Sequence, residues 1–146
     1  MKISKVAAFT ALIIITSTTV FAQVKKKATS TGKISAATME AGKAIYGRSC
    51  VTCHMADGLG VPNMNPPIVK TSYILGDKTK LLAIVLGGFN ERVEIEGDTY
   101  TNVMPSQEYL KDDEIASVLT YVRNSFGNKA SAVTVAEVKK ARAAKK

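Results

Sequence analysis

The chain has 146 residues, a length that suits one small domain once a targeting segment is removed. It carries 20 Lys or Arg against 12 Asp or Glu, for a formal net charge of +8, but the excess lies at the two ends. Residues 38–127 hold eight basic and eleven acidic side chains, so the central region is mildly acidic. With no recognisable binding motif, this distribution argues against a nucleic acid as the partner.

Residues 1–22 have the layout of a secretory signal. Lys2 and Lys5 precede an apolar stretch, and Val20-Phe21-Ala22 offers a small-x-small cleavage site. The apolar stretch is short and Thr-rich for a bilayer span, although an uncleaved membrane anchor is the alternative. We therefore expect a protein that is periplasmic or otherwise exported, with no transmembrane span in its mature form. Residues 23–37, rich in Lys, Ser and Thr, are expected to form a basic flexible linker.

The pattern of residues 38–49 predicts a first helix with Thr38 as its N-cap. Gly42 and Tyr46 lie one helical turn apart and Cys50 follows one turn later, so the three residues share a side of the helix. Glycine inside a helix costs about 1 kcal/mol relative to alanine. We therefore expect another element to approach closely at Gly42.

The segment Cys50-Val51-Thr52-Cys53-His54 contains both cysteines of the chain and its one histidine. The spacing C-x-x-C-H is the attachment signature of c-type haem: each thiol adds to one vinyl group, and the histidine binds the iron. A zinc site would need a second ligand pair, which the sequence lacks. A disulfide closing so short a loop would stabilise little, and a thioredoxin-like motif expects a βαβ context.

The middle of the chain alternates loops with one helix. Residues 57–65, rich in Gly, Pro and Asn, are expected to form a loop, and residues 66–68 continue it in an extended form. Asp77 is placed to cap a helix over residues 78–86, which Gly87-Gly88 would end.

The last third predicts a small hairpin around Val93, Ile95 and a Gly97-Asp98 turn, and then a strong helix over residues 112–125. Acidic residues in the first turn of that helix favour its N-terminus, and Gly127 is expected just after its end. The helix has a single apolar stripe, formed by Ile115, Val118, Leu119, Val122 and Phe126. Residues 130–144 predict a further short, frayed helix.

A haem iron bound by His54 keeps one open axial position, and with no second histidine a methionine is the leading candidate. Met104 lies in a loop before the last predicted helix and has enough chain to reach the distal face. Met39 begins the first helix, Met55 adjoins His54, and Met64 lies in the loop that should stay on the proximal side. Met104 is therefore the predicted second ligand.

From these residues the chain resembles a class I cytochrome c. The resemblance covers about residues 38–128, and residues 129–146 would then form a basic C-terminal tail. Its marks are Cys50-Val51-Thr52-Cys53-His54, Met104-Pro105, the Gly42 and Tyr46 pair, and Val118 and Tyr121 on the last helix.

The resemblance implies an all-α cytochrome c fold wrapped around one covalent haem, with a small β-hairpin before the Met loop. It implies thioether bonds at Cys50 and Cys53 and axial bonds from His54 and Met104. A proline carbonyl, matched best by Pro66 with Pro67 as the alternative, would accept a hydrogen bond from the ligand histidine and raise its basicity. Arg48, Tyr73 and Tyr100 are candidate partners of the haem propionates.

Residues 57–62, 97–100 and 121–128 are more similar to monohaem cytochromes that accompany periplasmic dehydrogenases or are fused to nitrite reductases and oxidases. Those proteins usually have Trp where this chain has Phe126, and often Ser or Thr where it has Lys111. The resemblance implies a non-enzymatic one-electron carrier with redox protein partners. The alternatives are a haem subunit of a larger complex and a ligand-binding or peroxidase-type protein. The basic tails are either solvated or tether the protein to an acidic partner or an anionic membrane surface.

Overall fold

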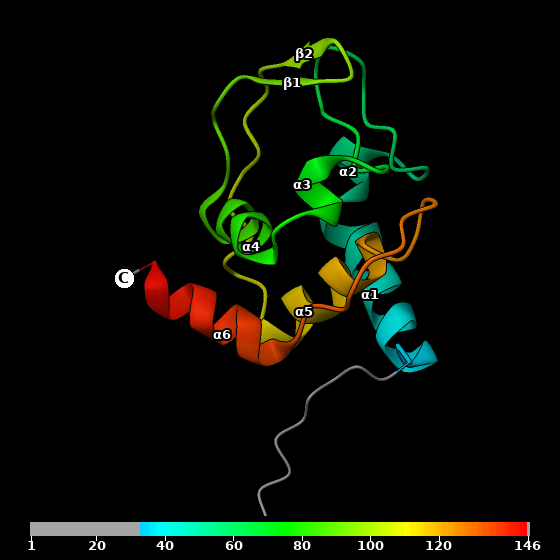
Figure 1. The fold of residues 1–146 in the computed structure, drawn as a ribbon, viewed down its shortest axis with the longest axis vertical. Helices are drawn as coiled ribbons and strands as arrows, with labels where there is room; N and C mark the ends of the chain where they lie inside the picture. Colours follow the sequence, from blue (N-terminus) through cyan, green and yellow to red (C-terminus); the bar gives the residue numbers. More distant parts are fainter. Residues whose placement is uncertain (1–32, 146) are drawn as a thin grey trace, which may run out of the picture. The chain divides into compact units, whose positions relative to one another are not determined.

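The structure is a computed structural model that describes residues 33–145. The predicted signal, residues 1–22, and residues 23–32 of the predicted linker lie outside the described residues. The elements in chain order are α1 (Ala36–Ser49), α2 (Val51–His54), α3 (Ser72–Leu75), α4 (Lys78–Gly87), β1 (Val93–Ile95), β2 (Asp98–Tyr100), α5 (Asp112–Val122) and α6 (Val135–Ala144). The predicted fold class, helical with one small hairpin, is confirmed (Figure 1). No helix in this described range is both long and apolar enough to cross a bilayer.

Helices α1 and α5 make the most extensive contact between two elements of the fold, and they cross in Figure 1. The contact is close at Gly42, where a Cβ would lie 2.3 Å from the Ser117 carbonyl oxygen and 2.5 Å from the Tyr121 Cβ. One turn further along α1, the ring of Tyr46 packs on that of Tyr121 with centroids 5.7 Å apart. The predicted close approach at Gly42 is therefore confirmed.

The start of α1 differs from the sequence prediction. The helix begins at Ala36, and its N-cap is Ser35 rather than Thr38. The Ser35 hydroxyl accepts a hydrogen bond from the Thr38 backbone N–H at 3.0 Å. An N-cap side chain accepts a hydrogen bond from the N–H two or three residues later. Ser35 does so and is therefore the N-cap, and Thr38 lies inside the first turn.

Helix α5 carries the predicted apolar stripe into the core, where Ile115, Val118, Leu119 and Val122 are all buried. Its N-terminus is stabilised by Glu114, whose carboxylate accepts from the Lys111 backbone N–H at 2.9 Å. A lysine side chain has no acceptor atom, so the bond to the N-cap backbone comes from the glutamate three residues later instead of from the N-cap side chain.

The other end of α5 lies three residues before the predicted one, at Val122 instead of residue 125. The Asn124 side chain donates to the Thr120 carbonyl at 2.9 Å, which competes with continued helical bonding. Phe126 and Gly127 then take left-handed backbone angles, with φ of 56° and 76°. This reversal directs the next residue, Asn128, into the interior.

The hairpin is present, but its turn is shifted by one residue from the prediction. Ile95 pairs with Asp98, so Glu96 and Gly97 form the loop, with φ of 55° and 88°, and Asp98 begins β2. Two-residue hairpin loops that match the twist of the strands require positive φ at both central positions. Just before the hairpin, α4 is capped by Asp77 as predicted and extends one residue further, to Gly87.

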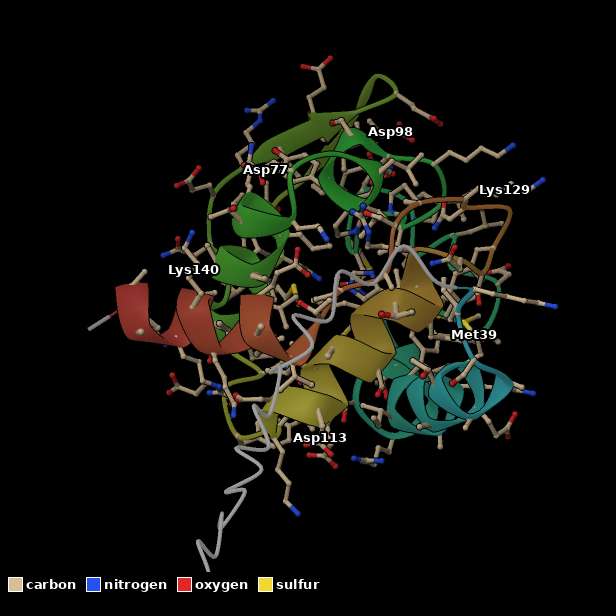
Figure 2. All side chains as sticks on the ribbon, turned by 60° about the horizontal axis from the view of Figure 1, so that its bottom comes forward. Met39, Asp77, Asp98, Asp113, Lys129 and Lys140 are labelled. Carbon is tan, nitrogen blue, oxygen red and sulfur yellow. The ribbon has the colours of Figure 1, made fainter. Side chains whose placement is uncertain are left out.

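The C-terminal segment forms α6, which packs on α4 and α5. Thr134 caps it through a hydrogen bond with Glu137, and Val138 is fully buried. Arg142 bonds the Asp112 carboxylate at 2.6 Å and Lys145 bonds the Glu108 carboxylate at 2.5 Å. The helix predicted as frayed is thus fixed at both ends, while Lys140 lies on its outer face (Figure 2).

Candidate functional site

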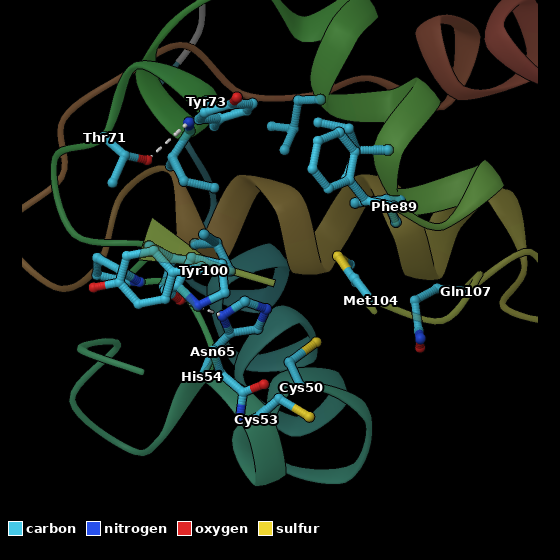
Figure 3. A pocket seen from close by; sticks show the side chains of 18 of the residues that line it. Cys50, Cys53, His54, Asn65, Thr71, Tyr73, Phe89, Tyr100, Met104 and Gln107 are labelled. Atoms are coloured by element: carbon cyan, nitrogen blue, oxygen red, sulfur yellow. Dashed lines mark hydrogen bonds between the residues drawn. The ribbon is translucent and has the colours of Figure 1, made fainter. Parts of the chain in front are cut away.

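A large pocket lies between the described elements, and the predicted site residues meet there. Cys50, Cys53 and His54 line one side of the pocket, and Pro66 lines it from the loop that follows them. Met104 lines it from the loop before α5 (Figure 3). The remaining lining comes from Tyr46 of α1, from α3, α4, the hairpin and the apolar face of α5, and from the loops that connect these elements. Residues more than fifty positions apart in sequence are thus gathered around one space.

The C-x-x-C-H segment is placed by a break between two helices. Cys50 ends α1, its N–H bonding the Tyr46 carbonyl at 2.9 Å, and the single turn of α2 follows. Met55 stops α2 with a left-handed φ of 62°. The hydroxyl of Tyr46 donates to the Met55 carbonyl at 2.6 Å, so the residue just after His54 is tied to the buried face of α1.

The two thiols differ in their surroundings. Cys50 is partly buried and Cys53 is exposed, and both are free thiols in the structure. Burial, reinforced by neighbouring Cys53 and opposed by Arg48, raises the pKa of the Cys50 thiol to about 11. Cys50 therefore faces the pocket interior, and Cys53 lies at its solvent edge.

His54 is held as a neutral imidazole with a defined tautomer. Its Nδ1 lies 3.0 Å from the Pro66 carbonyl oxygen, which can only accept, so Nδ1 carries the proton. Burial lowers the pKa of His54, and the bond to Pro66 opposes this effect. The lone pair is therefore on Nε2, the nitrogen that is free to bind a metal.

The Pro66 carbonyl is positioned by a tight loop. Val61 and Asn65 form a short antiparallel bridge, and the Gly60 N–H donates to the His54 carbonyl at 3.2 Å. A Cβ on Gly60 would lie 2.2 Å from the Asn65 oxygen and 2.7 Å from the Pro66 oxygen. With its φ of 66°, this position requires glycine for the loop to close behind His54.

The Met104 loop is fixed on its far side by α4. Met104 and Phe89 exchange two backbone hydrogen bonds, of 2.8 and 2.9 Å. Ser106 Oγ donates to the Leu86 carbonyl at 2.7 Å, and the Gln107 N–H donates to the Val85 carbonyl at 2.8 Å. This ladder leaves the Met104 thioether pointing into the pocket (Figure 3).

Of the other described methionines, Met55 and Met64 are 43% and 52% exposed, and neither they nor Met39 line the pocket. Arg48 does not line it either, and its guanidinium pairs with Glu114 at 2.5 Å. The other two candidate propionate partners, Tyr73 and Tyr100, do line it.

The lining suits a large apolar body with few polar groups at its rim. Glu91 is the only charged side chain among the described residues of the lining. The lining also contains three side-chain amides, those of Asn65, Asn102 and Gln107. Sequence reasoning missed these amides and Phe89. Asn65 and Asn102 bond each other at 3.3 Å across 37 residues, a contact with no local signal.

Two free thiols, an imidazole with Nε2 available and a thioether on one apolar pocket fit an iron porphyrin. No group of three or more His, Cys, Asp or Glu within residues 33–145 could hold a bare metal ion.

Comparison with known proteins identifies the class. The cytochrome c family model matches residues 39–126, and the chain belongs to this family. It is 35% identical over 113 residues to cytochrome c-552 of Thermus thermophilus, covering 71% of this chain and 86% of that protein.

Two further relatives are parts of dehydrogenases. The chain is 31% identical over 104 residues to the cytochrome c subunit of the quinone alcohol dehydrogenase of Gluconobacter oxydans. It is 30% identical over 110 residues to the fructose dehydrogenase cytochrome subunit of Gluconobacter japonicus. Each match covers 70% of this chain but only 22% of the relative. The chain is thus an electron-transfer cytochrome, and its cofactor is haem c, attached through Cys50 and Cys53.

Proposed function

We propose that this cytochrome is an exported one-electron carrier whose iron is bound by His54 Nε2 and Met104 Sδ. When bound, the haem supplies a reversible one-electron couple between ferric and ferrous iron. The observation that carries the proposal is the meeting of both side chains, from different walls, at one apolar pocket beside the C-x-x-C-H thiols.

The protein's own groups give each ligand a defined role. The Pro66 carbonyl holds the His54 ring by its Nδ1–H and makes the imidazole more basic. A thioether is neutral and soft, so Met104 favours the ferrous state and a raised potential. The buried apolar side chains of α4 and α5 exclude water from the pocket, which limits reorganisation around the changing charge.

With His54 and Met104 both holding the iron, the site would be suited to electron transfer rather than catalysis. Peroxide, oxygen or a substrate would have to displace Met104, whose backbone is tied to Phe89 by two hydrogen bonds. This arrangement supports a carrier over the ligand-binding or peroxidase-type alternative.

The proposed partners are redox proteins outside the cytoplasmic membrane, with a dehydrogenase as the favoured donor. The similarity to dehydrogenase cytochrome subunits supports this choice, and so does the signal-like segment at residues 1–22. The exposed Cys53 marks the solvent edge of the pocket, where a small and transient interface would form. Arg142 and Lys145 are engaged within the fold, which weakens the case for a C-terminal tether.

The test is replacement of the distal ligand. Met104→Ala should keep the covalent haem, lower the reduction potential and let added imidazole or cyanide bind rapidly at neutral pH. The matched control is Met64→Ala, because Met64 is half exposed and outside the pocket. Ligand binding and a potential that stay at wild-type values in Met104→Ala would refute the assignment.

A further inference from the structure

Asn128 links the end of α5 to the loop beside His54. The residue is only 3% exposed. Its Nδ2 donates to the Ile68 carbonyl at 2.9 Å and to the Val122 carbonyl at 2.8 Å, and its Oδ1 accepts from the Lys70 N–H at 2.7 Å. Both donors and the acceptor of one buried amide are therefore used to join two distant backbone segments.

The segment that Asn128 holds begins with the hydrogen-bond acceptor of His54. Pro66 accepts from Nδ1 of His54, and Ile68 and Lys70 follow two and four residues later. Ile68 is also held from its other side, because its N–H donates to the Gly58 carbonyl at 2.9 Å. Ile68 is thus clamped between the loop after α2 and the Asn128 amide.

The backbone on both sides of the Asn128 hydrogen bonds, at Lys70 and at Gly127, has left-handed angles. Lys70 has a left-handed φ of 53°, which costs an ordinary residue about 1–2 kcal/mol. Such a residue persists only where its surroundings over-determine it, and the bond from its N–H to Asn128 does so. Gly127, with a φ of 76°, turns the chain so that Asn128 points inward.

We propose that Asn128 is a positioning residue for His54, which sets the strength of the His54–Pro66 hydrogen bond by fixing residues 66–70. The inference rests on the proposed function, since it concerns His54 as the proximal ligand of the iron. It assigns to Asn128 a role in tuning the redox couple, although Asn128 does not line the pocket.

The physical consequence has a definite sign. A mobile Pro66 carbonyl accepts more weakly from Nδ1, so the imidazole becomes less basic, stabilises ferric iron less, and the potential rises. A fold that is merely looser admits water to the pocket, which favours the more charged ferric state and lowers the potential. The direction of the shift therefore separates positioning from general loosening.

The experiment compares Asn128→Ala with Asn124→Ala in the purified holoprotein. Asn124 is the matched control, because its amide also bonds a backbone carbonyl near the end of α5 but bonds Thr120 and not residues 66–70. The readouts are the reduction potential and, in the ferrous protein, the hydrogen exchange of His54 Nδ1–H followed by NMR. The wild-type ferric and ferrous spectra are recorded first, to establish low-spin ligation.

We expect Asn128→Ala to raise the potential and to accelerate Nδ1–H exchange by about tenfold, the factor that corresponds to losing a buried hydrogen bond. Asn124→Ala should leave both readouts at wild-type values. An unchanged or lowered potential in Asn128→Ala overturns the inference, whatever the rate of Nδ1–H exchange, while the low-spin spectrum leaves the proposed function intact. A wild-type spectrum without low-spin ligation would instead contradict the proposed function.

If Asn128→Ala does not accumulate, the wild-type protein still gives a test. A single positioned unit requires that the Lys70 backbone N–H and the His54 Nδ1–H exchange through the same opening and respond equally to added denaturant. Matching exchange supports the inference. A His54 proton that exchanges much faster than that of Lys70, with a different denaturant dependence, contradicts it.

Discussion

Substitution of alanine for two glycines of the same helix should have opposite effects on stability. Gly42 and Gly47 both lie in α1, where alanine is favoured over glycine by about 0.5–1 kcal/mol of helix propensity. A Cβ at Gly47 would have no neighbouring atom within 4 Å, so Gly47→Ala should gain that propensity in full.

At Gly42 the added Cβ would lie 2.3 Å from the Ser117 carbonyl oxygen, which belongs to the backbone and cannot rotate away. Helices α1 and α5 must separate to accept it, and overpacking of this kind costs about 1–3 kcal/mol. After the gain in propensity is subtracted, Gly42→Ala should lower the free energy of unfolding by about 1–2 kcal/mol.

The assay is guanidinium unfolding of the two holoproteins, followed by far-UV circular dichroism and fitted with a common slope. The predicted difference between the variants is about 2 kcal/mol, with opposite signs relative to wild type. Two variants of equal stability, or a stabilised Gly42→Ala, would refute the α1–α5 contact described here.

Three further predictions concern the attachment, the charges and the C-terminal helix. Cys53→Ala should mature poorly and retain at most one thioether; mass spectrometry and the pyridine haemochrome spectrum check this, and two intact thioethers would contradict it. Burial raises the pKa of Glu137, but its bonds from Lys78 and Thr134 outweigh burial and lower it. Because the pKa of Glu137 is lowered in the folded state, its bonds stabilise the fold above pH 4.5, and this stabilisation is lost as the pH falls further. The free energy of unfolding in urea should therefore fall less between pH 6 and pH 3 in Lys78→Ala than in the wild-type protein. Arg142→Ala should lower the free energy of unfolding by about 1–3 kcal/mol because it removes charge-assisted bonds at the α5–α6 contact, whereas Lys139→Ala, on the exposed side, should stay within about 0.5 kcal/mol.

The parts of the fold that were predictable are those with a local signal. The apolar stripe of α5 repeats with the helical period, and Gly42 is an unfavourable residue that only a close contact explains. The short helices α2 and α3 were not predicted, since a single turn has no period to detect. Helix α5 ends before its predicted end because the side-chain bond of Asn124 and the left-handed Phe126 override helix propensity.

The candidate site was predictable only where its chemistry lies in the residue types themselves. The thiols and His54 form a contiguous motif, and Met104 was the one methionine with the reach to face it. The pocket lining depends instead on pairings such as Phe89 with Met104. The partners of Asn128 at Ile68 and Lys70 are 60 and 58 residues away, so its role is visible only in three dimensions.

In the C-terminal segment, too, the helix has a local sequence signal but its contacts do not. Its alanines predicted a helix, but the acidic partners of Arg142 and Lys145 lie 30 and 37 residues earlier. Net charge alone therefore suggested a solvated or tethering tail, whereas the structure has basic side chains in bonds to Asp112 and Glu108.

Binding of the iron by both His54 and Met104 can be read from the visible spectrum of the oxidised, purified holoprotein. We expect a covalent, low-spin haem with the sulfur-to-iron charge-transfer band, which should vanish in Met104→Ala and persist in Met64→Ala. A high-spin spectrum, or a low-spin one without that band, would mean that Met104 is not bound and would contradict the carrier assignment.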